Sequence, residues 1–177
     1  MEGELVWRAC TSGPETTEAV GENLGRALVP GALVGLVGEL GSGKTTFVRG
    51  LARGLDVLEP VHSPTFTRMR SLSGRLALHH FDAWRGGSEA LFDEGAEFLA
   101  GSGVAVVEWA DRVEGRLPRP RIEILLWHRG PNGRELAARL LPAAPRSGAA
   151  ALELQRRLRL ALERAGETRG LEIDARA

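Results

Sequence analysis

Cysteine, tyrosine and lysine are nearly absent from this chain of 177 residues. There is no tyrosine, and the one cysteine, Cys10, excludes an internal disulfide framework and any cysteine-rich zinc site. We interpret Cys10 as a small buried apolar residue, a use of cysteine that fits a reducing compartment. Lys44 is the only lysine, so 22 of the 23 basic residues are arginines.

A net charge and long apolar runs are missing as well. The 23 basic and 23 acidic residues cancel, which excludes a general nucleic-acid coat and a polybasic membrane binder. The longest apolar stretch, residues 29–38, is far below the roughly 20 residues that span a bilayer. Residues 1–13 lack a basic region followed by an apolar one, so no secretory signal is expected. These absences predict a cytoplasmic protein without membrane attachment.

The apolar patterns that are present alternate between strand-like and helical spacing. Short apolar or alternating runs predict strands at 4–9, 32–38, 75–81 and 104–109, and helical periodicity is found at 14–28, 45–54, 88–100 and from 151 onward. A late hairpin is expected at 121–128 and 134–140, around Pro131-Asn132-Gly133. The pattern predicts an α/β domain of three layers with a mixed, mostly parallel central sheet.

Charge is distributed unevenly although it sums to zero. Residues 1–111 hold 9 basic and 15 acidic residues, whereas residues 112–146 hold 8 arginines and 3 glutamates. Such segregation can orient a partner protein, and the plain alternative is a set of solvated faces. If a partner or tRNA binds a charged surface, segment 112–146 is where we expect that surface.

The strongest motif follows the second predicted strand. Residues 38–45, GELGSGKT, match the phosphate-binding loop G-x-x-x-x-G-K-[ST]. Its glycines allow positive φ and a close backbone approach, so successive N–H groups can face one phosphate. Lys44 supplies a cation for the β and γ oxygens, and Thr45 supplies a hydroxyl for Mg²⁺. The motif predicts a nucleoside triphosphate as the ligand with Mg²⁺, within a P-loop NTPase fold. The expected nucleotide-binding residues of the loop are Glu39, Leu40, Gly41, Ser42, Gly43, Lys44, Thr45 and Thr46.

Two acids at strand ends are candidates for metal binding and water activation. Glu108 ends the apolar run at 104–108, where a second magnesium-side acid is expected, and Asp82 ends the strand before it. Either acid could instead cap a helix or turn. With a complete P-loop in the chain, we assign Thr45 and Glu108 to Mg²⁺. Which of Asp82 and Glu108 activates water is left open.

Four further residues near these strands have roles that the sequence leaves open. Thr65, in HSPTFT at 62–67, could close on the γ-phosphate or belong to an ordinary Ser-Pro turn. Neighbouring strand positions face opposite ways, so His79 and His80 are not expected to share a metal, and one of them should lie in the core or beside the site. By the same rule Trp109 should point away from Glu108, toward a base or the core.

Several segments together resemble one family, the bacterial tRNA threonylcarbamoyladenosine biosynthesis ATPase TsaE, also called YjeE. The matching segments are TTEAVGENLGRAL (16–28), GELGSGKTTFVRGLARGL (38–55), HSPTFT (62–67), HHFDAWR (79–85), VEWADR (107–112) and GRE (133–135). They occur in the family's order and cover nearly all of residues 5–140. Trp84 stands where the family usually has tyrosine, and Glu39 where it usually has aspartate.

The resemblance implies a compact P-loop fold and slow, Mg²⁺-dependent ATP hydrolysis. It implies complex formation with TsaB and TsaD-type proteins, which modify the adenosine next to the anticodon, and contact with tRNA either directly or through them. By the motif match, Asp82, Glu108 and Thr65 are the expected catalytic residues, and Trp109 and Arg134 are added to the nucleotide site. We expect an ATPase domain over residues 1–145, and an amphipathic helix and tail over 146–177.

Two other classes of P-loop protein were weighed against this one. A small-molecule kinase usually carries an arginine-rich lid after the P-loop helix. In that interval this chain has a short predicted hairpin, with its turn at Ser73-Gly74 and its second strand at 75–81, and only Arg68, Arg70 and Arg75. The kinase stays as the alternative. A guanine-specific switch usually needs N-K-x-D, which is excluded because the only lysine is already in the P-loop.

Overall fold

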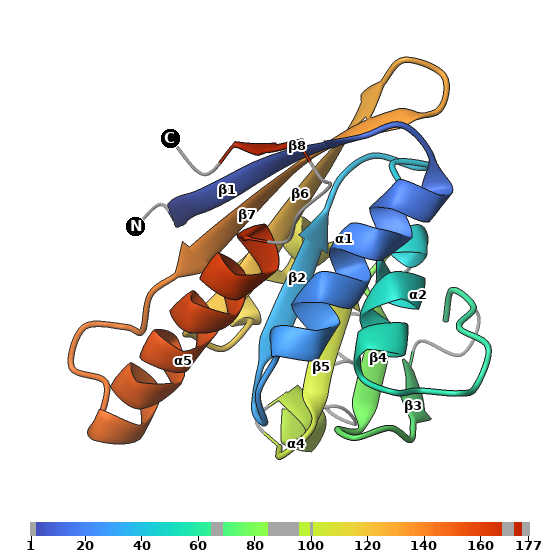
Figure 1. Cartoon of the computed structure of the whole chain (residues 1–177). Helices are drawn as coiled ribbons and strands as arrows, with labels where there is room; N and C mark the ends of the chain where they lie inside the picture. The colour runs from blue at the N-terminus through green and yellow to red at the C-terminus, as the bar shows by residue number, and fades with distance from the viewer. Residues whose placement is uncertain (1–2, 65–68, 85–95, 100, 168–171, 175–177) are drawn as a thin grey trace.

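The fold is built around one mixed sheet of eight strands, in the order β3-β4-β5-β2-β6-β7-β1-β8 (Figure 1). The computed structural model describes residues 3–64, 69–84, 96–99, 101–167 and 172–174. The strands are β1 (Glu4–Thr11), β2 (Leu33–Val37), β3 (Met69–Leu72), β4 (Leu78–Asp82), β5 (Val104–Glu108), β6 (Arg121–Arg129), β7 (Gly133–Leu141) and β8 (Glu172–Asp174). The helices are α1 (Pro14–Ala27), α2 (Lys44–Gly54), α4 (Ala96–Leu99), η1 (Ala110–Arg116) and α5 (Ala149–Gly166).

The predicted α/β class and the late hairpin are confirmed. Parallel pairing joins β4 to β5, β5 to β2 and β2 to β6, so the parallel part is the four central strands. The remaining pairs, β3–β4, β6–β7, β7–β1 and β1–β8, are antiparallel. The expectation of a mostly parallel sheet therefore holds for β4, β5, β2 and β6, which include the P-loop strand β2. The strands outside this group pair antiparallel. Among the described residues, no helix has the length and apolar character needed to cross a membrane.

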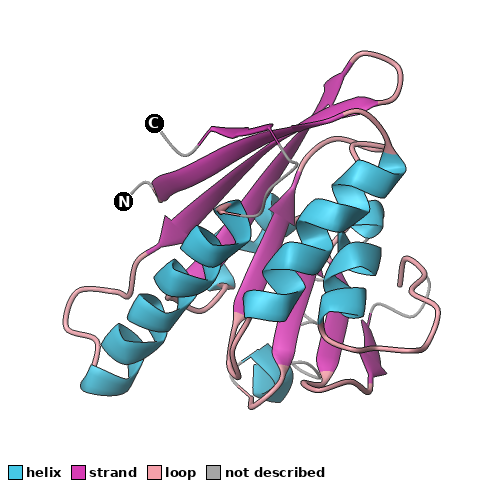
Figure 2. Ribbon diagram, viewed as in Figure 1, coloured by secondary structure: helices cyan, strands magenta, loops and turns pink. Residues whose placement is uncertain are grey.

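Helices cover both faces of the sheet, which gives the expected three layers. In β5, Val104 and Val106 pack into a core shared with α1, α2 and α5, whereas Ala105 and Val107 pack into a second core with α4 and η1. Figure 2 shows α1, α2 and α5 side by side on one face. A strand that buries both sides explains why the sequence at 104–107 is apolar without alternation.

Helices α1 and α2 are packed backbone against backbone. Both carry glycines four residues apart, at Gly21 and Gly25 in α1 and at Gly50 and Gly54 in α2. A Cβ added at Gly50 would lie 1.8 Å from the carbonyl oxygen of Glu18, and real Cβ atoms do not approach that closely. Contacts of this kind pack α1 along α2, the helix that begins where the P-loop ends.

The hairpin formed by β3 and β4 departs from its expected limits. Its second strand begins at Leu78 and not at residue 75. The Arg75 N–H donates to the carbonyl oxygen of Leu55 at 2.8 Å, so this residue leaves the strand ladder. The Arg75 guanidinium also donates to the carbonyl oxygens of Gly54 in α2, of Gly25 and Arg26 in α1, and of Leu28 just after α1. Arg75 thereby joins the carboxyl ends of both helices.

The segment after residue 145 contributes to the same core as the preceding residues. Leu158 and Leu162 of α5 are fully buried in the core that α1 and α2 share. The indole Nε1–H of Trp7 donates to the carbonyl oxygen of Leu162 at 3.1 Å, which ties α5 to β1. Strand β8, which the sequence patterns did not predict, pairs with the outer edge of β1. Of the helix expected at 88–100, residues 96–99 form α4, and residues 85–95 lie outside the described part.

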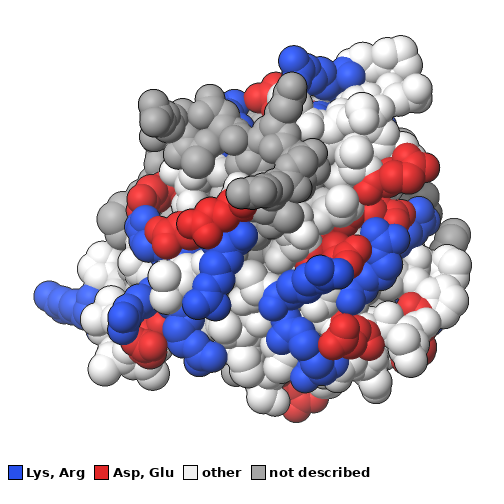
Figure 3. All heavy atoms as spheres, in the orientation of Figure 1, with Lys and Arg blue, Asp and Glu red and all other residues white. Residues whose placement is uncertain are grey.

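Surface charge is mixed on the face that carries α1, α2 and α5. Figure 3 shows acidic and basic side chains interspersed there. Arg53 of α2, for example, forms ion pairs with Glu18 and Glu22 of α1, at 2.8 and 3.3 Å. In the arginine-rich segment 112–146, Arg121 is fully buried and donates to Glu123 at 2.8 Å. The excess charge of that segment is therefore only partly on the surface.

Candidate functional site

The P-loop joins the end of β2 to the start of α2, as its motif predicts. β2 ends at Val37 and α2 begins at Lys44. Gly41 and Gly43 adopt positive φ values of 74° and 101°, which side chains with a Cβ rarely tolerate. The loop therefore curls back above the first turn of α2, where free helix N–H groups and the helix dipole favour an anion.

A cavity of about 590 Å³ opens beside this loop, at the carboxyl ends of the parallel strands. It is lined by Leu40, Gly41, Gly43, Lys44, Thr45, Thr46, Ser63, Asp82, Trp84, Glu108 and Trp109. Both candidate acids, the P-loop lysine and the P-loop threonine thus share one cavity. Of the remaining expected residues, Thr65 lies outside the described part of the chain, and Glu39, Ser42 and Arg134 do not line this cavity.

Lys44 is buried at the back of the cavity and fully engaged. Its ammonium donates to the carbonyl oxygens of Gly38 and Glu39 at 2.7 and 2.9 Å. The ammonium also lies 3.5 Å from the centroid of a Trp109 ring, a cation–π contact. Burial lowers the pKa of Lys44, and nearby carboxylates, that of Glu108 foremost, act against this shift.

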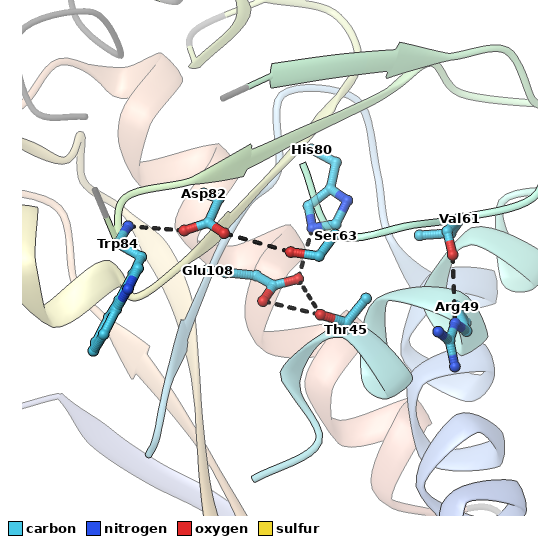
Figure 4. Close-up of polar contacts among 8 residues, drawn as sticks. All are labelled: Thr45, Arg49, Val61, Ser63, His80, Asp82, Trp84 and Glu108. Atoms are coloured by element: carbon cyan, nitrogen blue, oxygen red, sulfur yellow. Dashed lines mark hydrogen bonds and ion pairs between the residues drawn. The ribbon is translucent and has the colours of Figure 1, made fainter. Parts of the chain in front are cut away.

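Thr45 and Glu108 are joined directly, as Figure 4 shows. The Thr45 hydroxyl donates to Glu108 Oε1 at 2.8 Å, and the second carboxylate oxygen is 3.1 Å away. On the other side, Nε2 of the fully buried His80 lies 2.9 Å from Glu108 Oε1. His80 is therefore the histidine beside the site. His79 faces elsewhere, with Nδ1 2.9 Å from the Ser71 hydroxyl.

Asp82 and Glu108 are brought together by strand register. They are paired positions on the parallel strands β4 and β5, so the two carboxyl ends deliver them to one edge of the sheet. Asp82 Oδ1 accepts the Trp84 N–H at 2.8 Å, and Oδ2 accepts the Ser63 hydroxyl at 3.4 Å (Figure 4). Ser63 belongs to the HSPTFT segment, so this segment does reach the cavity.

Trp109 corrects one expectation. Strand alternation predicted that it points away from Glu108, yet both residues line the same cavity. The reason is that Trp109 adopts the left-handed conformation, with φ 61° and ψ 41°, and so ends the strand pattern. A bulky residue with positive φ is strained, and such strain tends to occur at functional sites.

The two tryptophans and two cations form a stack at the cavity wall. The rings of Trp84 and Trp109 lie 4.2 Å apart between centroids, with Lys44 against Trp109. The guanidinium of Arg112 lies 4.0 Å from the Trp84 ring centroid. Trp84 therefore contributes an aromatic face to the cavity wall.

The late hairpin reaches the outside of the P-loop. Arg134 donates through Nε to the Ser42 carbonyl at 3.0 Å and through Nη2 to the Gly41 carbonyl at 2.9 Å. His128 Nε2 lies 3.3 Å from the Leu40 carbonyl oxygen. His128 was missed from the sequence, and the one available signal was its position opposite Arg134 in the predicted hairpin. A smaller cavity of about 170 Å³ adjoins this contact.

Comparison with known proteins agrees with this geometry. The family model described as threonylcarbamoyl adenosine biosynthesis protein TsaE matches residues 11–136. This chain belongs to the TsaE family. The matched range contains the P-loop, both candidate acids, Trp109 and Arg134, so the whole described site lies in the part that the family shares.

Individual relatives give the same assignment. A Bacillus subtilis (strain 168) tRNA threonylcarbamoyladenosine biosynthesis protein TsaE is 39% identical over 134 residues, which are 75% of this chain and 84% of that protein. The protein of the same name from Treponema pallidum (strain Nichols) is 44% identical over 121 residues, covering 67% and 90%. The crystal structure of Bacillus subtilis YdiB superposes with a TM-score of 0.68 at 30% identity, covering 89% of this chain and 97% of that one.

Proposed function

We propose that this chain is a Mg²⁺-dependent ATPase that serves as an accessory subunit in tRNA threonylcarbamoyladenosine modification at position 37. Its hydrolysis of ATP would support turnover of a complex of TsaB and TsaD-type proteins. The observation that carries the proposal is the convergence of Lys44, Thr45 and Glu108 on one cavity behind a P-loop. The family to which the chain belongs supports the pathway.

The P-loop end of the cavity fits the phosphates of ATP. The free N–H groups at the start of α2 and the Lys44 ammonium supply positive charge at one point. In the ligand-free arrangement Lys44 is held by two carbonyl oxygens and the Trp109 ring, and phosphate oxygens would replace part of these contacts. The aromatic wall of Trp84 and Trp109 adjoins the phosphate end, where it excludes water.

Magnesium would bind between Thr45 and Glu108, whose oxygens are already within 2.8 Å. Mg²⁺ prefers oxygen ligands, keeps several waters and commonly takes only one or two protein ligands beside substrate phosphates. The described residues contain no group of three His, Cys, Asp or Glu that could hold a metal alone, which fits a metal that arrives with ATP. When bound, Mg²⁺ would neutralise charge on the β and γ phosphates.

Asp82 is the better candidate for orienting the attacking water. Glu108 is committed to the Thr45 hydroxyl and to His80, both on the metal side. Asp82 lies one strand further out and is held by the Trp84 N–H and the Ser63 hydroxyl. A carboxylate fixed in this way can accept a proton from water, or orient it, while Lys44 and the metal hold the phosphates.

Asp82→Asn and Glu108→Gln test the division of labour between the acids. Each change is expected to lower kcat for phosphate release at least about 100-fold, because positioning and metal-binding groups act on the reacting phosphate. ATP affinity without Mg²⁺ should change only a few-fold, since neither carboxylate attracts an anion. Glu59→Gln, at an exposed acid, is the matched control. Hydrolysis that survives both changes would refute the assignment of the acids.

The partner proposal is tested by co-purification with TsaB and TsaD-type proteins, with and without MgATP. We expect a complex whose amount depends on the nucleotide. Failure to form any complex, together with transfer of the γ-phosphate to a small acceptor, would favour the P-loop kinase instead. The exposed arginines of segment 112–146, among them Arg116, Arg129 and Arg146, are the first surface to probe for contact with a partner or tRNA.

A further inference from the structure

We propose that Arg134 and His128 are positioning residues, which act from the late hairpin to hold the P-loop in its phosphate-binding shape. This inference rests on the proposed function in that it concerns the same phosphate site. It assigns Arg134 a different task from direct contact with the nucleotide, and it gives His128 a role that no motif indicated.

Strand register places the two residues side by side, so that both contact the P-loop. His128 on β6 and Arg134 on β7 are paired positions. Both lie at most three residues from the tip of the hairpin. Together they contact three consecutive carbonyl oxygens of the loop, those of Leu40, Gly41 and Ser42. The guanidinium donates to two of these oxygens through two different nitrogens of its planar fork, which fixes their relative orientation.

Because peptide groups are planar, these contacts with the carbonyl oxygens also set the direction of the N–H groups on the opposite side of the loop. In a trans peptide group the C=O of one residue and the N–H of the next point in opposite directions. When Arg134 holds the Ser42 carbonyl, the Gly43 N–H must point away from the guanidinium, and the same holds for the Gly41 N–H when His128 holds the Leu40 carbonyl. Gly41 and Gly43 both line the cavity proposed for phosphate, on the side of the loop to which these N–H groups are expected to point.

Every carbonyl of the loop has a donor once the hairpin is counted. Lys44 binds those of Gly38 and Glu39. The hairpin pair binds the next three, and the Gly43 carbonyl accepts the Phe47 N–H at 2.8 Å as part of α2. A loop with two positive-φ glycines has many accessible conformations, so fixing its carbonyls lowers the entropy lost when phosphate binds.

The competing role for Arg134 is direct contact with the nucleoside. Arg134 borders the smaller cavity of about 170 Å³, together with Thr17, Pro131 and Asn132, and a nucleoside could enter there. The two roles differ in what they affect. Positioning acts on the loop before any ligand arrives and on every phosphate ligand, whereas direct contact acts only on ligands that carry the nucleoside.

The first experiment compares Mg²⁺-pyrophosphate and MgATP binding to Arg134→Met by calorimetry. We expect both affinities to fall by a similar factor of about ten, the usual consequence of losing charge-assisted hydrogen bonds. A fall for ATP alone would assign Arg134 to the nucleoside, and no fall for either ligand would also overturn the proposal. Arg139→Met is the matched control, because this half-buried arginine lies on the same strand, away from the loop. If wild-type protein bound neither ligand, the proposed function itself would fail.

The second experiment needs no ligand and so stands apart from the proposed function. Hydrogen exchange of the peptide that contains residues 38–45 is measured in ligand-free protein. Arg134→Met should raise the exchange rate of these amides several-fold without changing that of β5, and His128→Leu should have a smaller effect, since it removes one weaker contact of 3.3 Å. Unchanged exchange in the loop of both variants would overturn the proposal.

Discussion

Lys44→Ala is expected to reduce the affinity for ATP by about two orders of magnitude or more. The change removes the only lysine of the chain and the cation at the back of the cavity. Charge-assisted hydrogen bonds contribute about 1.5–3 kcal/mol each, and 1.4 kcal/mol corresponds to a tenfold change in affinity. The carbonyl oxygens of Gly38 and Glu39 would also lose the Lys44 ammonium as a donor, and the Glu39 oxygen would keep only the Ser42 N–H at 3.2 Å.

Lys44→Arg is the informative companion, because it keeps the charge and changes the shape. The guanidinium is too wide for a position between two carbonyl oxygens and an indole ring, so we expect most of the affinity to be lost here too. Both variants should be compared by calorimetry with wild-type protein, at equal Mg²⁺. Wild-type affinity in Lys44→Ala would contradict the assignment of the P-loop.

Gly50→Ala is expected to lower the free energy of unfolding by about 3 kcal/mol or more. In an isolated helix, alanine would be favoured over glycine by about 1 kcal/mol. Here the added methyl group would lie 1.8 Å from the Glu18 carbonyl oxygen and must push α1 away from α2. Overpacking against a backbone cannot be relieved by a rotamer change, so the cost lies at or above the upper end of the range for such substitutions.

Urea denaturation checks this prediction through the transition midpoint. Gly115→Ala is the control, because no atom lies within 4 Å of the Cβ that it would add. An unchanged midpoint in Gly50→Ala would mean that the helices can separate without loss. Nucleotide affinity should fall together with stability, since the α1 contact positions the start of α2.

The parts predicted from the sequence are those that depend on local pattern. The P-loop is contiguous in sequence, so its glycines predict the turn, and Lys44 and Thr45 predict the binding of phosphate and Mg²⁺. Buried parallel strands are apolar on both sides, which identified β2 and β5 from composition alone. Asp82 and Glu108 could be placed together because parallel strands end at the same edge of the sheet.

The parts that could not be predicted depend on contacts between distant residues. Trp109 leaves the strand pattern through a backbone conformation that its own sequence does not favour. Arg121 looked like part of a charged surface, but η1 and β6 bury it beside Glu123. The contact of His128 with Leu40 joins residues 88 positions apart, so only the folded hairpin brings them together.

Because the chain has a single lysine, a reagent that modifies side-chain amines labels one known position. Lys44 carries the only side-chain primary amine of the chain, and it sits in the proposed phosphate site. Its lowered pKa increases the share of the neutral amine, which is the form that reacts with acylating reagents. A single acyl group found on a side-chain amine therefore reports one atom at one site. Because α-amines are acylated as well, protection of Lys44 by a bound ligand is followed as a mass difference of the peptide that contains residue 44, with no engineered label.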